Sequence, residues 1–227
     1  MLCQADKLAF TKPQGFIVLE GVNGAGKTTL QNSIAGYFEK AGRACLKTFE
    51  PGATELGKAL RKLLLERPHE SKTPLTEVFL FAADRAEHVA GRIQPALCAG
   101  EIVISDRYFY STLAFQGYGR GLDVDMLERI NRIAIDGTTP DLVILMDLDP
   151  EEGLRRTRSR QDATAGIDKF EDEELAFHRR LRDGFLQSAK NLPETFLVVD
   201  ASRSQAEIFE AVKPALDKLR AAMGAAK

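Results

Sequence analysis

The sequence predicts an α/β fold in which helices cover both faces of a five-stranded parallel sheet. Two observations lead to this class. Short apolar runs such as Phe16–Leu19 and Leu142–Met146 do not alternate with polar residues, which is typical of strands buried on both faces. Segments with helical periodicity separate these runs, and a chain that alternates strands with helices forms a parallel sheet.

Each expected strand ends at a polar residue or begins after a turn. Phe16–Leu19 stops at Glu20 and Gly21, and Ile102–Ser105 stops at Asp106. Thr139-Pro140-Asp141 introduces the fourth strand, and the second is the weakest in pattern. The five expected strands are Phe16–Leu19, Ala44–Thr48, Ile102–Ser105, Leu142–Met146 and Phe196–Val199.

Helices are expected between the strands, with breaks at glycine and proline. Gly42 closes the first helix, Pro74 opens the longest one, and Pro95 is where that helix could kink. The expected ranges are Lys27–Lys40, Thr54–Leu65, Pro74–Ala99, Phe109–Phe115, Val124–Ile135, Pro150–Arg160, Glu171–Lys190 and Ser204–Ala222.

The length of 227 residues suits one domain, which we place at residues 15–223. Residues 1–14 are expected to form a loosely ordered leader. They contain no long apolar segment, so we do not interpret them as a secretory signal. No apolar run approaches the ~20 residues that span a membrane, so no membrane association is expected.

Composition narrows the range of partners. The 31 basic and 33 acidic side chains give a net charge of −2, which does not favour nucleic acid as the main partner. The three cysteines, Cys3, Cys45 and Cys98, stand at wide spacings and form neither a metal-ligand pattern nor a disulfide framework. We therefore expect reduced thiols in a cytoplasmic protein.

A complete phosphate-binding motif follows the first strand. Residues 21–28, Gly-Val-Asn-Gly-Ala-Gly-Lys-Thr, match G-x-x-x-x-G-K-[ST] and open a predicted helix, so a chance glycine-rich turn is a poor alternative. Glycines let backbone N–H groups surround one anion, and the helix N-terminus adds partial positive charge. The residues expected to hold the phosphates of ATP are Gly21, Val22, Asn23, Gly24, Ala25, Gly26, Lys27, Thr28 and Thr29.

Two side chains of this loop have tasks of their own. Lys27 should reach the β- and γ-phosphates, and the Thr28 hydroxyl should bind Mg²⁺. The motif predicts nucleotide binding but does not identify a phosphate acceptor. A guanine-reading Asn-Lys-x-Asp is missing, and no strand ends in Asp-Glu, so a GTPase switch and a motor ATPase are disfavoured.

Aspartates follow two of the strands. Asp106 precedes Arg107, so a carboxylate that can hold a Mg²⁺-bound water stands beside a guanidinium that can clamp a phosphate. For Asp147, at the other strand end, we expect a solvated or capping position.

Arginines crowd the segment before a polar stretch. Arg155, Arg156, Arg158 and Arg160 could belong to a short mobile lid at about residues 156–170, which would exclude water over the transferring phosphoryl group. The alternative is a solvated basic helix face paired with glutamates 151 and 152. We favour the alternative for Arg155, and the lid for Arg156 and Arg160, which share one helix face.

Phe81 and Arg85 are spaced i, i+4 and can point into one cleft. An aromatic face and a guanidinium would suit a nucleotide acceptor. Periodicity alone leaves the alternative open that Phe81 is a core residue.

With these motifs in place, the chain resembles the bacterial thymidylate kinase family from about Phe16 to Leu219. The most specific parts are Glu50-Pro-Gly-Ala-Thr54, Leu80-Phe-Ala-Ala-Asp-Arg85 and the segment from Asp106-Arg-Tyr to Phe115-Gln116. Pro140–Asp147 and Asp168-Lys-Phe-Glu171 are also similar to the family.

The resemblance implies the reaction ATP + dTMP → ADP + dTDP, in line and without a covalent enzyme intermediate, in a homodimer built on helices like Pro74–Ala99. It implies catalytic roles for Lys27, Asp106, Arg107 and Arg160, with Thr28 and Asp106 at Mg²⁺ and Arg156 and Arg160 on the ATP phosphates.

The dTMP-binding residues would be Asn23, Glu50, Arg61, Phe81, Arg85, Arg107, Ser111, Thr112 and Gln116. Phe81 would stack on thymine, Arg85 and Gln116 would bind its polar edge, and Arg61 and Arg107 would grip the acceptor phosphate. Glu50 and Asp106 would organise the metal, its waters and the acceptor oxygen.

Three residues depart from the family pattern. Asn23 stands where a carboxylate is usual near the acceptor 3′-hydroxyl, Phe49 replaces a common arginine, and Lys169 replaces the arginine of the lid motif. Asn can still accept a hydrogen bond, whereas Lys cannot make a bidentate contact. Two alternatives therefore stay open: another P-loop nucleotide or nucleoside kinase, and a non-catalytic nucleotide-binding protein.

Overall fold

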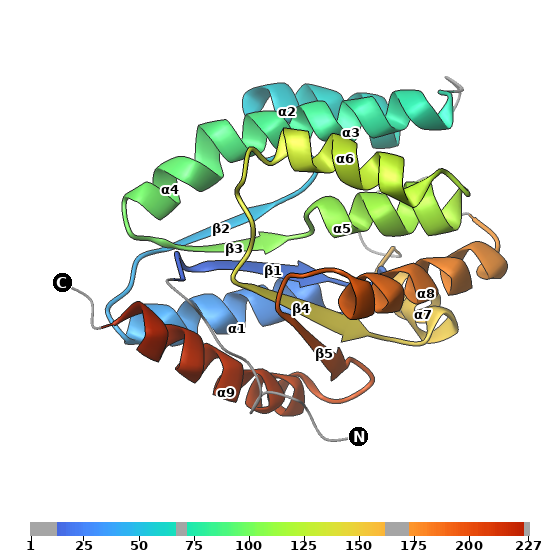
Figure 1. Ribbon diagram of the computed structural model, residues 1–227. Helices are drawn as coiled ribbons and strands as arrows, with labels where there is room; N and C mark the ends of the chain where they lie inside the picture. The colour runs from blue at the N-terminus through green and yellow to red at the C-terminus, as the bar shows by residue number, and fades with distance from the viewer. Residues whose placement is uncertain (1–12, 67–71, 162–172, 225–227) are drawn as a thin grey trace.

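The computed structural model describes residues 13–66, 72–161 and 173–224 (Figure 1). The strands form one parallel sheet in the order β2-β3-β1-β4-β5, which confirms the predicted class. Both ends of each predicted strand lie within one residue of the ends of the observed strand. The strands are β1 (Phe16–Glu20), β2 (Cys45–Phe49), β3 (Ile102–Asp106), β4 (Leu142–Asp147) and β5 (Phe196–Asp200).

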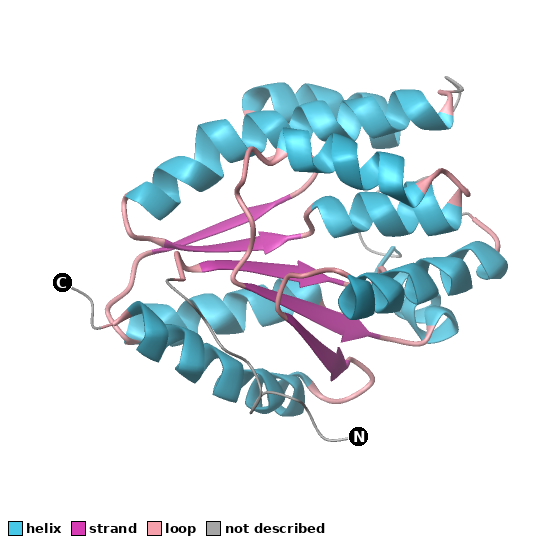
Figure 2. Ribbon diagram, viewed as in Figure 1, coloured by secondary structure: helices cyan, strands magenta, loops and turns pink. Residues whose placement is uncertain are grey.

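Helices cover both faces of this sheet (Figure 2). The α-helices are α1 (Lys27–Lys40), α2 (Glu55–Arg61), α3 (Pro74–His88), α4 (Gln94–Cys98), α5 (Phe109–Thr112), α6 (Val124–Ala134), α7 (Pro150–Gln161), α8 (Leu175–Asn191) and α9 (Gln205–Met223). Three π-helical segments continue α2, α3 and α5: η2 (Lys62–Glu66), η3 (Val89–Ile93) and η4 (Leu113–Gly119).

The alternation of side chains along β1 divides the core between the two faces. Ile17 and Leu19 pack with residues of α1 and α9. Phe16 and Val18 pack with residues of α3, α4, α5 and α6 on the other face. All four side chains are fully buried, which explains why the strand reads as a continuous apolar run.

Two helix predictions needed correction. The long helix predicted from Pro74 to Ala99 is not one regular α-helix. It passes from α3 through the wider turns of η3 into α4, and Pro95 stands in the first turn of α4. Helix α8 begins at Leu175 and not at Glu171, with Glu174 as its N-cap residue.

The predicted leader lies outside the described residues apart from Pro13 and Gln14, and so does most of the predicted lid, including Lys169. All five strands and every described helix lie within the predicted domain, at residues 15–66, 72–161 and 173–223. That these residues form one domain stays a prediction. Within the described parts of the chain, no helix is long and apolar enough to cross a membrane.

The sheet brings the expected functional segments to one edge. Leu19 pairs with Asp106, and Phe49 also pairs with Asp106, so the carboxyl ends of β1, β2 and β3 lie together. The phosphate loop leaves β1 at this edge, and ligands of open α/β sheets bind there.

Candidate active site

The phosphate loop depends on glycines in left-handed conformation. Gly21, Gly24 and Gly26 have φ values of 137°, 82° and 91°, which side chains rarely adopt. A Cβ atom at Gly21 would lie 2.5 Å from the carbonyl oxygen of Met146, and one at Gly24 would collide with the carbonyl oxygen of Gly153. The loop is therefore packed closely against β4 and α7.

Lys27 lies over the same loop. Its side chain is buried, and its Nζ donates hydrogen bonds of 3.1 Å to the carbonyl oxygens of Gly21 and Val22. An ammonium held at the mouth of a loop of backbone N–H groups is suited to a polyphosphate.

The start of α1 meets the end of β3 through one side-chain contact. The Thr28 hydroxyl donates to Asp106 Oδ2 at 3.1 Å. A hydroxyl and a carboxylate are hard oxygen ligands of the kind Mg²⁺ prefers, and Mg²⁺ usually takes one or two protein ligands plus substrate phosphates. Among the described residues there is no cluster of three or more His, Cys, Asp or Glu side chains that could hold a metal by itself. The two oxygens therefore fit Mg²⁺ that arrives with a nucleotide.

Arg107 occupies a strained backbone position and links the phosphate loop to α5. Its φ is 77°, unusual for a residue with a side chain. Its guanidinium donates to the Gly21 carbonyl (3.2 Å), Ser111 Oγ (3.0 Å) and Asn23 Oδ1 (2.5 Å). It also lies over the ring of Phe115, 5.3 Å from its centroid. Asn23, the first departure from the family pattern, thus positions Arg107.

Glu20 stabilises the turn after β3 and was not among the predicted site residues. Its carboxylate accepts from the backbone N–H of Tyr108 (2.9 Å) and from the hydroxyl of Ser111 (2.7 Å). Burial raises the pKa of Glu20 from 4.5 to about 7, while Arg107 opposes the rise. Its place directly before Gly21 at the end of a strand was the signal available in the sequence.

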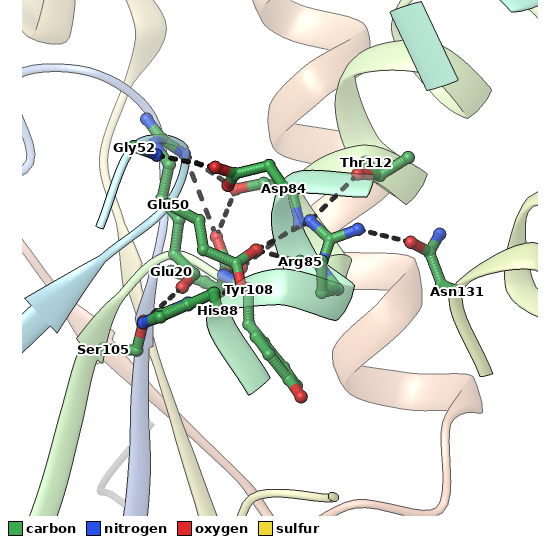
Figure 3. Close-up of polar contacts among 12 residues, drawn as sticks. Glu20, Glu50, Gly52, Asp84, Arg85, His88, Ser105, Tyr108, Thr112 and Asn131 are labelled. Carbon is green, nitrogen blue, oxygen red and sulfur yellow. Dashed lines mark hydrogen bonds and ion pairs between the residues drawn. The ribbon is translucent and has the colours of Figure 1, made fainter. Parts of the chain in front are cut away.

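A second polar cluster lies where β2 ends and α3 passes (Figure 3). Arg85 is almost fully buried, and its Nε donates to Glu50 Oε2 at 2.9 Å. The guanidinium also donates to Thr112 Oγ1 (3.3 Å) and Asn131 Oδ1 (2.5 Å). His88 Nδ1 contacts Glu50 Oε1 at 2.9 Å. Glu50, Arg85 and Thr112 were predicted from the sequence, whereas Asn131 and His88 were not.

Two further residues of the predicted site, Gln116 and Phe81, lie outside this hydrogen-bonded cluster. Gln116 is buried in η4, and its amide nitrogen Nε2 has no hydrogen-bond partner among the described residues. Phe81 is half-buried and packs against the apolar cluster of η4 and α8. A buried donor without a partner costs free energy, so it is suited to a ligand that accepts.

The remaining predicted residues have partners of their own. Arg61 donates to the carbonyl oxygen of Pro51 (2.7 Å) and lies 5.8 Å over the exposed ring of Phe49, the second departure. Arg156 donates to Glu152 and to the carbonyl oxygen of Ala201. Arg155 pairs with Glu152, as the alternative interpretation expected. The side chain of Arg160 lies outside the described residues.

The position of Asp147 differs from the solvated or capping position that was predicted. It is neither free in solvent nor a cap, because Arg182 of α8 donates to both of its carboxylate oxygens at 2.6 and 2.8 Å. This bidentate pair joins β4 to α8.

A phosphate loop facing a strand-end aspartate, with a separate polar cluster at the end of the neighbouring strand β2, defines a P-loop phosphotransferase of the nucleoside monophosphate kinase class. Comparison with known proteins agrees. The family model for thymidylate kinase matches residues 19–212. The chain belongs to the thymidylate kinase family.

Individual relatives support this membership. The chain is 42% identical over 207 residues to the thymidylate kinase of Desulfosudis oleivorans, covering 90% of this chain and 97% of the relative. It is 47% identical over 204 residues to the thymidylate kinase of Nitratidesulfovibrio vulgaris (strain Miyazaki F), covering 88% and 95%. The crystal structure of thymidylate kinase from Ehrlichia chaffeensis superposes with a TM-score of 0.68 at 31% identity, over 87% of this chain and 96% of that one.

Proposed function

We propose that this protein transfers the γ-phosphoryl group of ATP to dTMP, giving ADP and dTDP for dTTP and DNA precursor synthesis. The observation that carries the proposal is the contact between Thr28 and Asp106, which joins a phosphate loop to the edge of a separate acceptor pocket. Phosphoryl transfer needs positioning and charge stabilisation more than covalent chemistry, and this arrangement offers both.

On the donor side, Lys27 and the loop N–H groups hold the polyphosphate. Mg²⁺ held by Thr28 and Asp106 would neutralise charge on the phosphates when bound. Arg107 lies between the loop and the pocket, so its guanidinium is suited to charge that builds up between donor and acceptor. Arg156 and Arg160 would cap the donor phosphates from α7.

On the acceptor side, the amide nitrogen of Gln116, which finds no partner in the described parts of the chain, would donate to a carbonyl oxygen of the base, and Phe81 would stack on its ring. Arg85 would present a guanidinium to the same edge. Ser111 and Thr112 would line this pocket. Arg61 and Arg107 would hold the phosphate, and Asn23 would accept from the 3′-hydroxyl.

A coupled ADP-release assay with dTMP, dUMP, dCMP, AMP, GMP and free thymidine tests the acceptor. We expect dTMP to be the best substrate and Lys27→Ala to abolish turnover. Equal rates for all monophosphates would refute the choice of acceptor, and a preference for thymidine would indicate a nucleoside kinase. No turnover with any acceptor would indicate a non-catalytic nucleotide-binding protein.

A homodimer in the cytoplasm is also part of the proposal. Leu75 and Phe79, one helical turn apart on α3, are 41% and 56% exposed, and an exposed apolar face of this kind is suited to a second copy. Cys45 and Cys98 are free thiols, in keeping with a reducing compartment. Sedimentation velocity should show a dimer that Phe79→Glu dissociates. An unchanged sedimentation coefficient for this variant would exclude α3 as the interface.

A further inference from the structure

Arg85 is a buried guanidinium whose orientation is set by partners from three other elements. A buried charge must be paired, and each partner fixes one edge of its plane. Glu50, at the end of β2, takes the edge formed by Nε and Nη2, both 2.9 Å from Oε2. Thr112 and Asn131 accept from the remaining edge. The position of Glu50 therefore decides how Arg85 lies.

His88 holds the other oxygen of Glu50. A carboxylate can only accept, so the 2.9 Å contact between His88 Nδ1 and Glu50 Oε1 requires a hydrogen on Nδ1. At the opposite side of the ring, Nε2 lies 2.6 Å from the hydroxyl of Thr48. In the neutral ring, Nε2 accepts from this hydroxyl, which completes a chain of hydrogen bonds from Thr48 through His88 and Glu50 to Arg85. Figure 3 labels the His88, Glu50 and Arg85 part of this chain.

Asp84, a second buried carboxylate, competes with Glu50 for Arg85, so Glu50 needs the contact from His88. Asp84 lies beside the cluster: its Oδ1 accepts from the N–H of Gly52 at 3.0 Å, and its Oδ2 has no hydrogen-bond partner within the described residues. The cluster therefore contains two buried carboxylates for one guanidinium. Without a donor at Oε1, the flexible side chain of Glu50 could turn away and release Arg85 toward Asp84.

We infer that His88 is a positioning residue for the acceptor pocket, which acts through Glu50 to hold the Arg85 guanidinium in the orientation that binds the pyrimidine. His88 itself is fully buried, and its two ring nitrogens face Glu50 and Thr48. This inference rests on the proposed function, because it assumes that Arg85 borders the dTMP base. The competing interpretation is a structural histidine that only joins α3 to β2.

Three substitutions of His88 test the hydrogen bonds at its two ring nitrogens separately. The amide nitrogen of asparagine can occupy the place of Nδ1, and that of glutamine the place of Nε2. His88→Asn therefore keeps the donor to Glu50, His88→Gln keeps only the contact with Thr48, and His88→Leu loses both. We expect His88→Gln and His88→Leu to raise the KM for dTMP by about tenfold, and His88→Asn to stay within about threefold of wild type. The KM for ATP should not change in any of them.

A structural role predicts a different pattern. If all three variants lose thermal stability and share one KM for dTMP, His88 is structural and the inference is wrong. Thr48→Val is a milder variant that keeps the shape of the side chain and should raise the KM for dTMP about threefold, which keeps the test valid if His88→Leu does not fold. An unchanged KM in both Thr48→Val and His88→Gln would overturn the inference.

The activity of the wild-type protein in the same assay distinguishes failure of the proposed function from failure of the inference about His88. If wild type does not phosphorylate dTMP, the proposed function fails. If wild type is active and the variants do not follow the order given above, only the inference about His88 fails. A ¹⁵N spectrum of the labelled imidazole should show a proton on Nδ1 of His88, and a proton on Nε2 alone would contradict it.

Discussion

Thr28 Oγ1 and Asp106 Oδ2 lie 3.1 Å apart, although 78 positions separate the two residues in the chain. Parallel pairing of β1 with β3 produces this contact, because it places Asp106 opposite Leu19 and so beside the loop that leaves β1. The loop motif and the strand-end aspartate are separate signals in the sequence, and the sheet joins them into one candidate metal and phosphate site.

Asp106→Asn should lower kcat about 100-fold and raise the Mg²⁺ concentration needed for half-maximal activity, because an amide is a weaker ligand than a carboxylate. Steady-state assays across a Mg²⁺ titration measure this. Asp147→Asn is the matched control, since Asp147 also ends a strand but pairs with Arg182. It should leave the Mg²⁺ requirement unchanged. Equal effects of the two variants would argue against Asp106 as a metal ligand.

Phe81→Ala should weaken dTMP binding by ~1–3 kcal/mol if the ring stacks on the base, with hardly any change in ATP affinity. Isothermal titration calorimetry with each nucleotide measures both values. Phe209→Ala removes another half-buried ring, packed on the opposite face of the sheet, and should leave dTMP affinity unchanged. Equal loss of dTMP and ATP affinity in Phe81→Ala would mean that Phe81 is simply a core residue.

Gln116→Leu should weaken dTMP binding by ~1–3 kcal/mol without lowering the melting temperature. The reason is that the buried amide nitrogen has no partner among the described residues, so replacing it breaks no hydrogen bond of that nitrogen. Calorimetry and thermal unfolding of the same samples test both statements. A lower melting temperature with normal dTMP affinity would assign Gln116 to the fold and not to the ligand.

Asp84→Asn should remove part of the pH dependence of stability. Burial, and then the nearby Glu50, raise the pKa of Asp84 from 3.8 to about 6. The folded state therefore holds this proton more tightly than the unfolded state, and wild type loses roughly 3 kcal/mol of stability as pH rises from about 4 to about 6. Urea unfolding of both proteins across this range should show the variant gaining relative to wild type. A constant difference would contradict the raised pKa.

Most of the fold could be predicted because its signals are local. The strands are buried on both faces and read as apolar runs, and the phosphate loop is a contiguous motif between a strand and a helix. The π-helical segments could not be predicted in this way, because a wider turn is a response to packing and leaves no periodicity of its own. Gln116 lies in such a segment.

The candidate site could be predicted only where each residue carries its own signal. Arg85 was expected from its spacing to Phe81, but its partners Glu50 and Asn131 stand 35 and 46 positions away in the chain. The number of positions between two residues in the sequence does not tell how far apart they lie once the sheet has formed. Glu20, Asp84 and His88 were missed for the same reason, and Asp147 was expected in solvent because its partner Arg182 lies on a later helix.

One site in this protein should pass a phosphoryl group from the loop-bound donor to a pyrimidine monophosphate. The most direct measurement mixes γ-labelled ATP with dTMP and Mg²⁺ and separates the products by chromatography. We predict that the label appears in dTDP with wild type and disappears from it with Lys27→Ala. Label released only as inorganic phosphate, or found in dTDP at the same rate with both proteins, would contradict the claim.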